Sequence, residues 1–255
     1  MNIFELKKLF IEQSKHSGYQ ALSSKLLQFI DIDKKYIKSR YERERLKYIL
    51  ENIDIENKTV LDIGGNTGFF TFELIDNGAK KVCYYEGNKT HAKFVDGAAD
   101  IIGIRNKIEI NNEYFTFNEK LNDKYDLLIL LNVSHHIGDD YGDKKISIEK
   151  AKETILNQLN YLSTIAETMV FQMGFNWKGN RELGLFQGGT KKEMIDFIKE
   201  GTSGYWRIYK IGIAESINEV IEYHDLDDKN INRWDSMGEF LNRPIFIMKS
   251  LRFNP

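Results

Sequence analysis

The chain has 255 residues, of which 42% are hydrophobic and 29% are charged, so it holds enough apolar material for a large core. Its 36 basic and 38 acidic residues leave a net charge of −2, which disfavours the broad basic surface typical of nucleic-acid-binding proteins. The single cysteine, Cys83, excludes an internal disulfide framework and indicates a reducing compartment. The first residues lack the apolar core of a signal peptide, and no apolar run is long enough to span a bilayer. We therefore expect a soluble cytoplasmic protein without a transmembrane segment.

The N-terminal part of the chain is predicted to be helical. Three segments have apolar residues at helical spacing: 4–13, 21–30 and 39–50. The third opens with Ser39 and Glu42 at the spacing of a capping box. We therefore predict an N-terminal helical cap over residues 1–55 and a main domain over residues 56–255.

From residue 58 onward, short apolar runs alternate with helical patterns. The runs predicted as strands are 59–64, 81–86, 107–111, 125–131, 167–173, 207–215 and 244–251. The helical patterns are 69–78, 90–102, 146–165 and 190–201. The last of them begins with Thr190 and Glu193 at capping-box spacing. This alternation predicts an α/β fold with a mostly parallel sheet and helices on both faces. The last two strands are joined by a polar connection, 217–243, which we expect to be a functional loop.

A glycine-rich turn follows the first predicted strand. The turn "GGNTG" contains Gly64, Asn66 and Gly68, and a helix begins behind it at Phe69. Glycines permit positive φ and close approach of a ligand to the backbone, and a helix start offers free N–H groups. The turn matches neither the Walker pattern nor the dinucleotide pattern. Because the acidic Asp62 precedes it, the turn suits a ligand with a positive centre and an amino group.

The second predicted strand ends in an acidic residue, Glu86, which is followed by Gly87. A carboxylate about 20 residues past the glycine turn can accept hydrogen bonds from both hydroxyls of a ribose. The alternative is an ordinary strand–helix–strand unit with a solvated glutamate. The turn and the glutamate together favour a nucleoside ligand.

These motifs resemble those of the class I S-adenosylmethionine-dependent methyltransferases. "VLDIGGNTG" is similar to their first motif, Glu86 to their ribose-binding acid, and "YDLLILLNVSHHI" to their fourth-strand motif. The resemblance covers residues 56–255. It implies a Rossmann-like seven-stranded sheet, S-adenosyl-L-methionine as methyl donor and S-adenosyl-L-homocysteine as product. It also implies that Asp62 supports the turn and that Asn132 lies beside the sulfonium. The residues that it places at the donor are Asp62, Gly64, Asn66, Gly68, Phe69, Glu86, Gly87, Glu113, Tyr114 and Asn132.

Two arginines, Arg40 and Arg45, precede the first strand in "SRYERERLKYIL". On a helix, a spacing of five residues puts them about 140° apart, so they do not fully share one face. Arginine suits bidentate binding of carboxylate or phosphate, and the alternative is an exposed helix with Glu–Arg pairs. The chain also resembles bacterial methyltransferases of surface-polysaccharide biosynthesis, including the methyltransferase half of the O-antigen chain-terminating kinase–methyltransferases. Those enzymes carry such an arginine pair, and the resemblance assigns both arginines to the donor site.

Two adjacent histidines, His135 and His136, follow the fourth predicted strand. Ligands of open α/β sheets bind past the carboxyl ends of the strands, so we expect one histidine to be catalytic and to face the methyl acceptor. Histidine can take the proton of an alcohol acceptor, or it can bind an anionic phosphate-type oxygen. The alternative is that one ring packs against the sheet and the other is solvated. Asp139 and Asp140 follow closely, but no cluster has zinc-ligand spacing, and we expect no metal.

Aromatic and cationic side chains follow the fifth predicted strand and recur in the connection 217–243. The residues predicted to bind the acceptor are Gln172, Asn176, Trp177, Lys178, Arg181, Arg233 and Trp234. Such groups suit a sugar or a phosphorylated small molecule. The enzymes resembled here methylate a phosphate at a glycan terminus, and a relative in function is methylation of capsular phosphoramidate. We therefore predict O-methylation of a small-molecule, sugar or phosphate-type group in capsule or O-antigen biosynthesis, with the class of acceptor left open.

Other functions remain as alternatives to this prediction. A nucleotide-binding oxidoreductase would be expected to carry the pattern G-x-G-x-x-G, which the turn lacks. A tRNA methyltransferase would be expected to carry a basic patch. A non-catalytic S-adenosylmethionine-binding subunit would share the donor motifs. We expect a small-molecule or glycan partner and no nucleic acid, and the sequence leaves the oligomeric state open.

Overall fold

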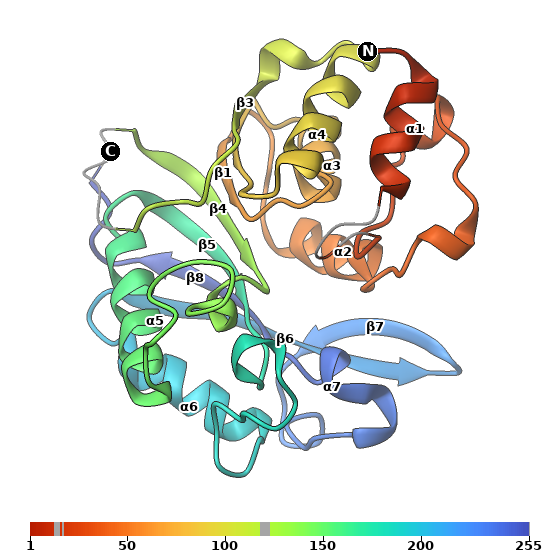
Figure 1. The fold of residues 1–255 in the computed structure, drawn as a ribbon. Helices are drawn as coiled ribbons and strands as arrows, with labels where there is room; N and C mark the ends of the chain where they lie inside the picture. Colours follow the sequence, from red (N-terminus) through yellow and green to blue (C-terminus); the bar gives the residue numbers. More distant parts are fainter. Residues whose placement is uncertain (13–15, 17, 118–122, 255) are drawn as a thin grey trace. The chain divides into compact units, whose positions relative to one another are not determined.

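The computed structural model describes residues 1–12, 16, 18–117 and 123–254, and the chain divides into two compact units (Figure 1). The first unit is Met1–Phe115 and the second is Thr116–Pro255. The boundary predicted at residue 55 lies inside the first unit. Residues 118–122, between the third and fourth predicted strands, lie outside the described residues.

The first unit contains a parallel sheet in the order β3-β2-β1, with helices packed against it. The strands are β1 (Thr59–Ile63), β2 (Lys81–Tyr85) and β3 (Ile108–Asn111). The helices are α1 (Ile3–Ile11), α2 (Glu42–Asn52), α3 (Phe69–Asp76) and α4 (Lys89–Ile101). Strand β1 is buried from Val60 to Ile63, as expected of a parallel strand that is covered on both faces. Helix α1 lies beside α4 (Figure 1), and the ring centroids of Phe10 and Phe94 are 5.3 Å apart.

The second unit contains a mixed sheet in the order β4-β5-β8-β6-β7. Its strands are β4 (Tyr125–Leu131), β5 (Ala166–Gln172), β6 (Trp206–Ile217), β7 (Val220–Asp225) and β8 (Ile245–Ser250). Its helices are α5 (Ile148–Leu162), α6 (Lys191–Gly201) and the short α7 (Gly238–Leu241). Strands β4 and β5 are parallel, and the other neighbouring pairs are antiparallel. The carboxyl ends of β4 and β5 therefore lie at the same edge of this sheet.

The described residues form eight strands, so the predicted count of seven is wrong. The polar connection 217–243 is not a plain loop, because β7 pairs with β6 as a hairpin. The hairpin turns at Asn218 and Glu219, where φ is 51° and 67°. Two successive residues with positive φ match the right-handed twist of the flanking strands. The asparagine was the signal in the sequence that could have revealed this turn.

The predicted cap is less helical than expected. In place of a helix over 21–30, the structure has a single 3-10 turn, Leu26–Gln28. The backbone N–H of Ser24 donates to the Glu73 carboxylate at 2.5 Å, and the Ser23 hydroxyl accepts from Leu26 N at 3.4 Å. The Ser23 side chain and a distant carboxylate therefore take backbone hydrogen bonds that a helix would make within itself.

The two predicted capping boxes have different outcomes. At α6, Thr190 and Glu193 form the reciprocal capping box, and the helix ends at Gly201, so this prediction is confirmed. At α2 the prediction is wrong, because the helix begins at Glu42 with Tyr41 as N-cap in the left-handed region, φ 58°. The Ser39 hydroxyl instead donates to the Glu42 carboxylate at 2.6 Å.

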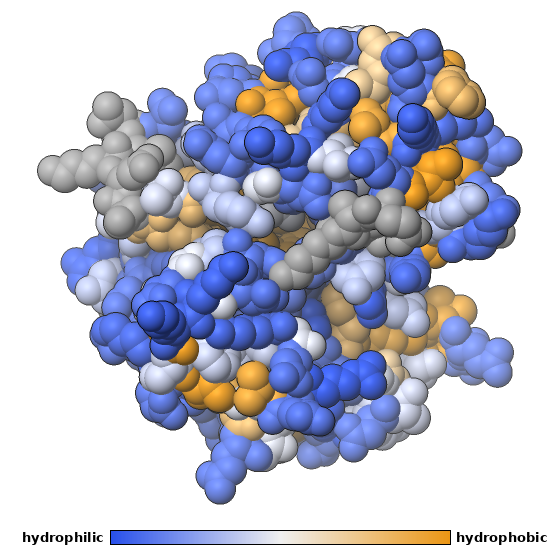
Figure 2. Space-filling model, viewed as in Figure 1, coloured by the Kyte–Doolittle hydropathy of each residue, from blue (hydrophilic) through white to orange (hydrophobic). Residues whose placement is uncertain are grey.

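The surface is mainly polar. Figure 2 shows a largely hydrophilic face with scattered apolar patches, in keeping with the balanced charge of the chain. Among the described residues, no helix combines the length and the apolar character needed to cross a bilayer.

Candidate functional site

The glycine turn between β1 and α3 has an unusual backbone. Three of its residues have positive φ: Gly64 at 71°, Asn66 at 52° and Gly68 at 80°. The N–H groups of Gly64 and Gly65 both donate to the Tyr85 carbonyl, at 2.9 and 3.2 Å. The turn is thus held against the end of β2. Glycine suits positions 64 and 68 because positive φ is strained for most other residues, and asparagine, as at position 66, tolerates it better than most.

Asp62 lies beneath this turn and is buried. It accepts a hydrogen bond from the Thr71 hydroxyl of α3 at 2.6 Å. Burial raises the pKa of Asp62 to about 7, the Thr71 hydrogen bond lowers it, and the charge of Glu86 adds to the rise. This contact ties β1 to α3 and suits the supporting role that the family resemblance implied.

Glu86 fastens the turn from the side of β2. Its two carboxylate oxygens accept from the backbone N–H of Asn66 at 2.8 Å and from that of Asn88 at 2.7 Å. The side chain is half-buried. A carboxylate held in this way presents negative charge at the carboxyl end of β2, beside the glycine turn.

An aromatic surface lies next to Glu86. The Tyr114 side chain is 53% exposed, and a Cβ added at Gly87 would lie 2.5 Å from its ring. The ring therefore rests directly on the Gly87 backbone. The neighbouring Glu113 is exposed. A ring with one covered face and substantial exposure is the kind of group on which an adenine can stack.

Gln20 completes the turn and was not singled out from the sequence. Its side-chain oxygen accepts from the backbone N–H of Phe69 at 3.1 Å and from the Thr67 hydroxyl at 3.4 Å. Gln20 therefore takes one of the free N–H groups at the start of α3. No local pattern points to this contact, because 49 residues separate Gln20 from Phe69.

The arginines before β1 lie in two different environments. Arg45 is buried in α2, 3.6 Å from Glu42 and stacked on the ring of Phe70 at 5.1 Å. Arg40 precedes the helix and lies over the ring of Tyr19 at 4.9 Å. The helical geometry assumed for the pair is therefore wrong, since only Arg45 is part of a helix. Their assignment to the donor stays a prediction.

In the second unit, Asn132 ends β4 in the left-handed region, with φ 63°. Its side-chain nitrogen donates to Gln172 Oε1 at 2.9 Å, and its backbone N–H donates to the Gln172 carbonyl at 2.7 Å. Gln172 is fully buried and donates to the Arg243 carbonyl at 3.0 Å. Gln172 therefore binds protein groups that fix the end of β4.

Arg243 and Glu239 belong to the same cluster and were not predicted from the sequence. Arg243 Nη1 donates to Asn132 Oδ1 at 2.7 Å, and Arg243 Nε lies 3.1 Å from both Glu239 oxygens. Glu239 also accepts from the Phe175 N–H at 3.0 Å. Burial opposes ionisation of Glu239, but the charge and hydrogen bonds of Arg243 hold its pKa below the usual value. We call Asn132, Gln172, Glu239 and Arg243 the strand-end network.

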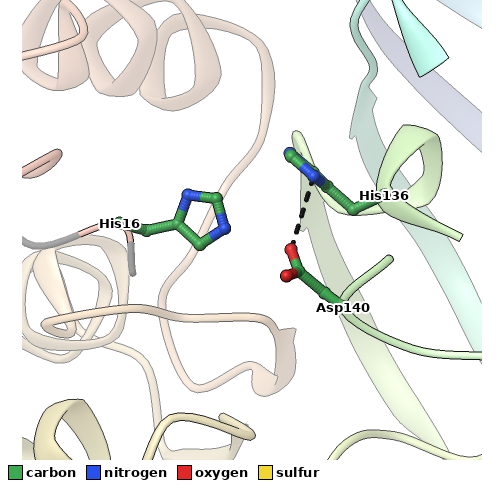
Figure 3. Close-up of side chains that lie close together, drawn as sticks. All are labelled: His16, His136 and Asp140. Carbon is green, nitrogen blue, oxygen red and sulfur yellow. Dashed lines mark ion pairs between the residues drawn. The ribbon is translucent and has the colours of Figure 1, made fainter. Parts of the chain in front are cut away.

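The two histidines differ sharply in environment. His135 is 2% exposed, and its Nδ1 accepts from the Gly174 N–H at 3.1 Å. The side chain of His136 is 16% exposed, and its Nδ1 lies 3.3 Å from Asp140 Oδ2 (Figure 3). The two ring centroids are 4.3 Å apart. His135 is therefore bound to the backbone that follows β5, whereas His136 is paired with a carboxylate.

The predicted acceptor residues after β5 include one clear structural anchor. Trp177 is buried, and its indole N–H donates to the Ile137 carbonyl at 2.8 Å. Lys178 has φ 56°, and its ammonium lies 4.2 Å from the centre of the Trp177 ring. Asn176 is half-buried and Arg181 is exposed. Trp177 therefore fixes the segment that follows His135 and His136.

The remaining predicted residues follow β7. Arg233 donates to the Gly189 carbonyl at 2.6 Å and pairs with Asp235 at 2.7 Å. Trp234 is 59% exposed. Arg233 therefore ties its loop to the start of α6, while Trp234 presents an apolar ring at the surface.

Comparison with known proteins gives one relative among curated proteins. Hemolysin A from Brachyspira hyodysenteriae is 33% identical over 133 residues, which are 50% of this chain and 48% of that protein. The chain therefore spans about half the length of the curated relative that it matches. No family model matches the chain.

Solved structures show the fold more fully. The bifunctional kinase-methyltransferase WbdD is similar over 96% of this chain and 46% of that protein, with a TM-score of 0.60 and 16% identity. Residues 942–1257 of StiE O-MT are similar over 84% of this chain and 75% of that one, with a TM-score of 0.53 and 15% identity. The chain has a methyltransferase fold. At these identities the likeness concerns the fold alone.

Proposed function

We propose that the chain is an S-adenosyl-L-methionine-dependent O-methyltransferase of the cytoplasm, with S-adenosyl-L-homocysteine as product. The observation that supports this most is the glycine turn fastened to Glu86 at the carboxyl ends of β1 and β2. Bound there, S-adenosyl-L-methionine supplies a methyl group on a positively charged sulfonium.

The residues of the first unit fit this donor. Gly64 has no side chain, so a ligand can approach the backbone of the turn closely there. Glu86 provides a fixed carboxylate for ribose hydroxyls, and the Tyr114 ring on Gly87 provides a surface for the adenine. Asp62 is buried and bonded to Thr71, so it supports the turn and does not contact the donor.

For the acceptor, we propose a sugar or phosphate-type group in capsule or O-antigen biosynthesis. Two things support this class of acceptor. One is the fold shared with the kinase-methyltransferase WbdD and with StiE O-MT. The other is the chemistry of two predicted acceptor residues: Lys178 after β5 offers a cation, and Trp234 after β7 offers an exposed aromatic ring.

Isothermal titration calorimetry tests the donor site. The wild type should bind S-adenosyl-L-methionine and S-adenosyl-L-homocysteine with a Kd in the micromolar range, about −8 kcal/mol. Glu86→Ala should weaken binding by about 1.5–3 kcal/mol, because a charged hydrogen-bond acceptor is lost. Glu109→Gln is the matched control, since Glu109 is an exposed acid of β3 whose carboxylate pairs with Lys81. A wild type that binds NADH and neither donor nor product would point to an oxidoreductase instead.

Mass spectrometry tests the acceptor. The protein is incubated with isotope-labelled S-adenosyl-L-methionine and bacterial sugar nucleotides, capsule or O-antigen polysaccharide. A single labelled methyl group on an oxygen is the expected product. Label found only on RNA would overturn the proposed class of acceptor.

A further inference from the structure

We infer that His136 and Asp140 form a general-base dyad and that the acceptor presents a hydroxyl group. The inference rests on the proposed methyltransferase function and deepens it. It assigns different tasks to two adjacent histidines, and it chooses between the alcohol and phosphate-type acceptors that the sequence left open.

His135 is excluded as the base by its hydrogen bond. Its Nδ1 accepts the Gly174 N–H at 3.1 Å, so the neutral ring carries its proton on Nε2. The site is also closely packed, because a Cβ added at Gly174 would lie 2.8 Å from His135 Nε2 and 3.1 Å from Arg243 Cζ. A ring that is 2% exposed and engaged in this way is a positioning residue.

His136 has the opposite arrangement. Its Nδ1 lies 3.3 Å from Asp140 Oδ2, and at that distance the negative charge of the carboxylate favours the tautomer with a proton on Nδ1. The lone pair of the neutral ring then lies on Nε2, on the other side of the ring from Asp140. This is the tautomer that a general base requires, and it is the reverse of the tautomer in His135.

The backbone holds the dyad in a fixed geometry. The N–H groups of Asp139 and Asp140 both donate to the His136 carbonyl, at 3.0 and 3.1 Å. The Gly138 N–H donates to the Tyr141 carbonyl at 2.7 Å, which closes the loop that carries Asp140. Trp177 binds the Ile137 carbonyl from η5 (Trp177–Gly179). A pre-set geometry of this kind lowers the cost of orienting a base.

The dyad can accept the one proton that a hydroxyl acceptor must release on methylation. As the acceptor oxygen forms its bond to the methyl carbon, the sulfur–methyl bond breaks and its electron pair stays on sulfur. The hydroxyl proton passes to His136 Nε2, and Asp140 stabilises the resulting imidazolium. A phosphate-type oxygen has no proton to give up at neutral pH, and the Asp140 carboxylate would repel its charge. The dyad therefore favours a hydroxyl acceptor.

Nitrogen NMR of the full-length protein tests the two tautomers directly. The chain has only five histidines, so their ring nitrogens can be resolved and assigned with single substitutions. At about pH 9, above the ordinary histidine pKa of about 6.5, His135 should carry its proton on Nε2 and His136 on Nδ1. Asp140→Ala should shift the His136 tautomer toward Nε2–H and leave His135 unchanged. The matched control, Asp139→Ala, should leave both rings unchanged.

The inference is overturned if His136 is an Nε2–H tautomer in the wild type, or if Asp140→Ala leaves its nitrogens unchanged. Inorganic phosphate serves as the probe for the class of acceptor. Phosphate at millimolar concentrations should leave the His136 signals in place, and a saturable shift would instead indicate an anion site.

On the acceptor identified by mass spectrometry, His136→Asn should lower the rate of methyl transfer about 10²–10⁴-fold. Full rate in that variant would overturn the base assignment. Calorimetry of the same variant should give unchanged donor affinity, so failure of the dyad is distinguishable from failure of the donor site.

Discussion

The two units differ in how the residues at the carboxyl ends of their strands are held in place. In the first unit, the glycine turn is held by residues close in sequence, with Glu86 only 20 residues from Asn66. In the second unit, the strand-end network joins Asn132 to Gln172 and Arg243 across 40 and 111 residues. The first arrangement is one strand–helix–strand unit whose pattern can be recognised locally. The second depends on side chains that meet only after the sheet has formed.

The largest expected effect is a loss of folding stability with rising pH, caused by Asp62. The unfolded carboxyl has an ordinary pKa of about 3.9, whereas the folded one has a pKa of about 7. Between these values the folded state binds the proton more tightly, so stability is lost as the pH rises from about 4 to about 7. The loss is about 1.4 kcal/mol per pH unit, or about 4 kcal/mol in total. Urea denaturation across this range should show the decline, and Asp62→Asn should remove most of it. A decline of the same size in Asp62→Asn would contradict the assignment.

The next effect concerns the strand-end network. Arg243→Met should destabilise the protein by about 3 kcal/mol, because it removes the cation that faces the largely buried Glu239. The double variant with Glu239→Gln should recover part of this loss, which urea denaturation would measure. Glu86 and the glycine turn lie in the first unit, so donor binding through these groups should persist in both variants. A double variant less stable than Arg243→Met would argue against a coupled pair.

A smaller effect is expected at the glycine turn. Gly68→Ala places a Cβ at φ 80° and 2.9 Å from the side chains of Phe72 and Val95, and it should cost about 2 kcal/mol. Gly103→Ala is the control, because Gly103 has φ 72° but open space around its Cβ position. The control should cost about 1 kcal/mol from backbone strain alone. If the two variants lose equal stability in denaturation curves, the contacts of the added Cβ with side chains of α3 and α4 contribute nothing measurable.

The smallest expected loss of stability concerns Gln20, which is 49 residues away from Phe69 in the sequence. Gln20→Ala removes the acceptor for the Phe69 N–H and should cost about 1 kcal/mol, as for other helix caps. Gln20→Glu keeps a side-chain acceptor and should stay close to wild-type stability in the same thermal or urea assay. If both variants lose equally, the contact does not cap α3.

The sequence by itself determined the parts of this protein that follow from local patterns. Apolar runs identified β1 to β6 and β8, and the spacing of Thr190 and Glu193 identified the start of α6, because both signals act within a few residues. The glycine turn and Glu86 were recognisable for the same reason, since one strand–helix–strand unit carries them both.

The tertiary structure decided what depends on distant contacts. The segment 21–30 lacks its predicted helix, and Glu73, 49 residues away from Ser24, takes the Ser24 N–H. The strand β7 in the connection 217–243 was missed for another reason, because its hairpin with β6 has a local signal in Asn218. Adjacent histidines look alike in a sequence, yet Gly174 engages His135 while Asp140 faces His136. Local propensity carries no information on contacts between residues as far apart as Gly174 and His135 or Ser24 and Glu73, so only the folded chain assigns those partners.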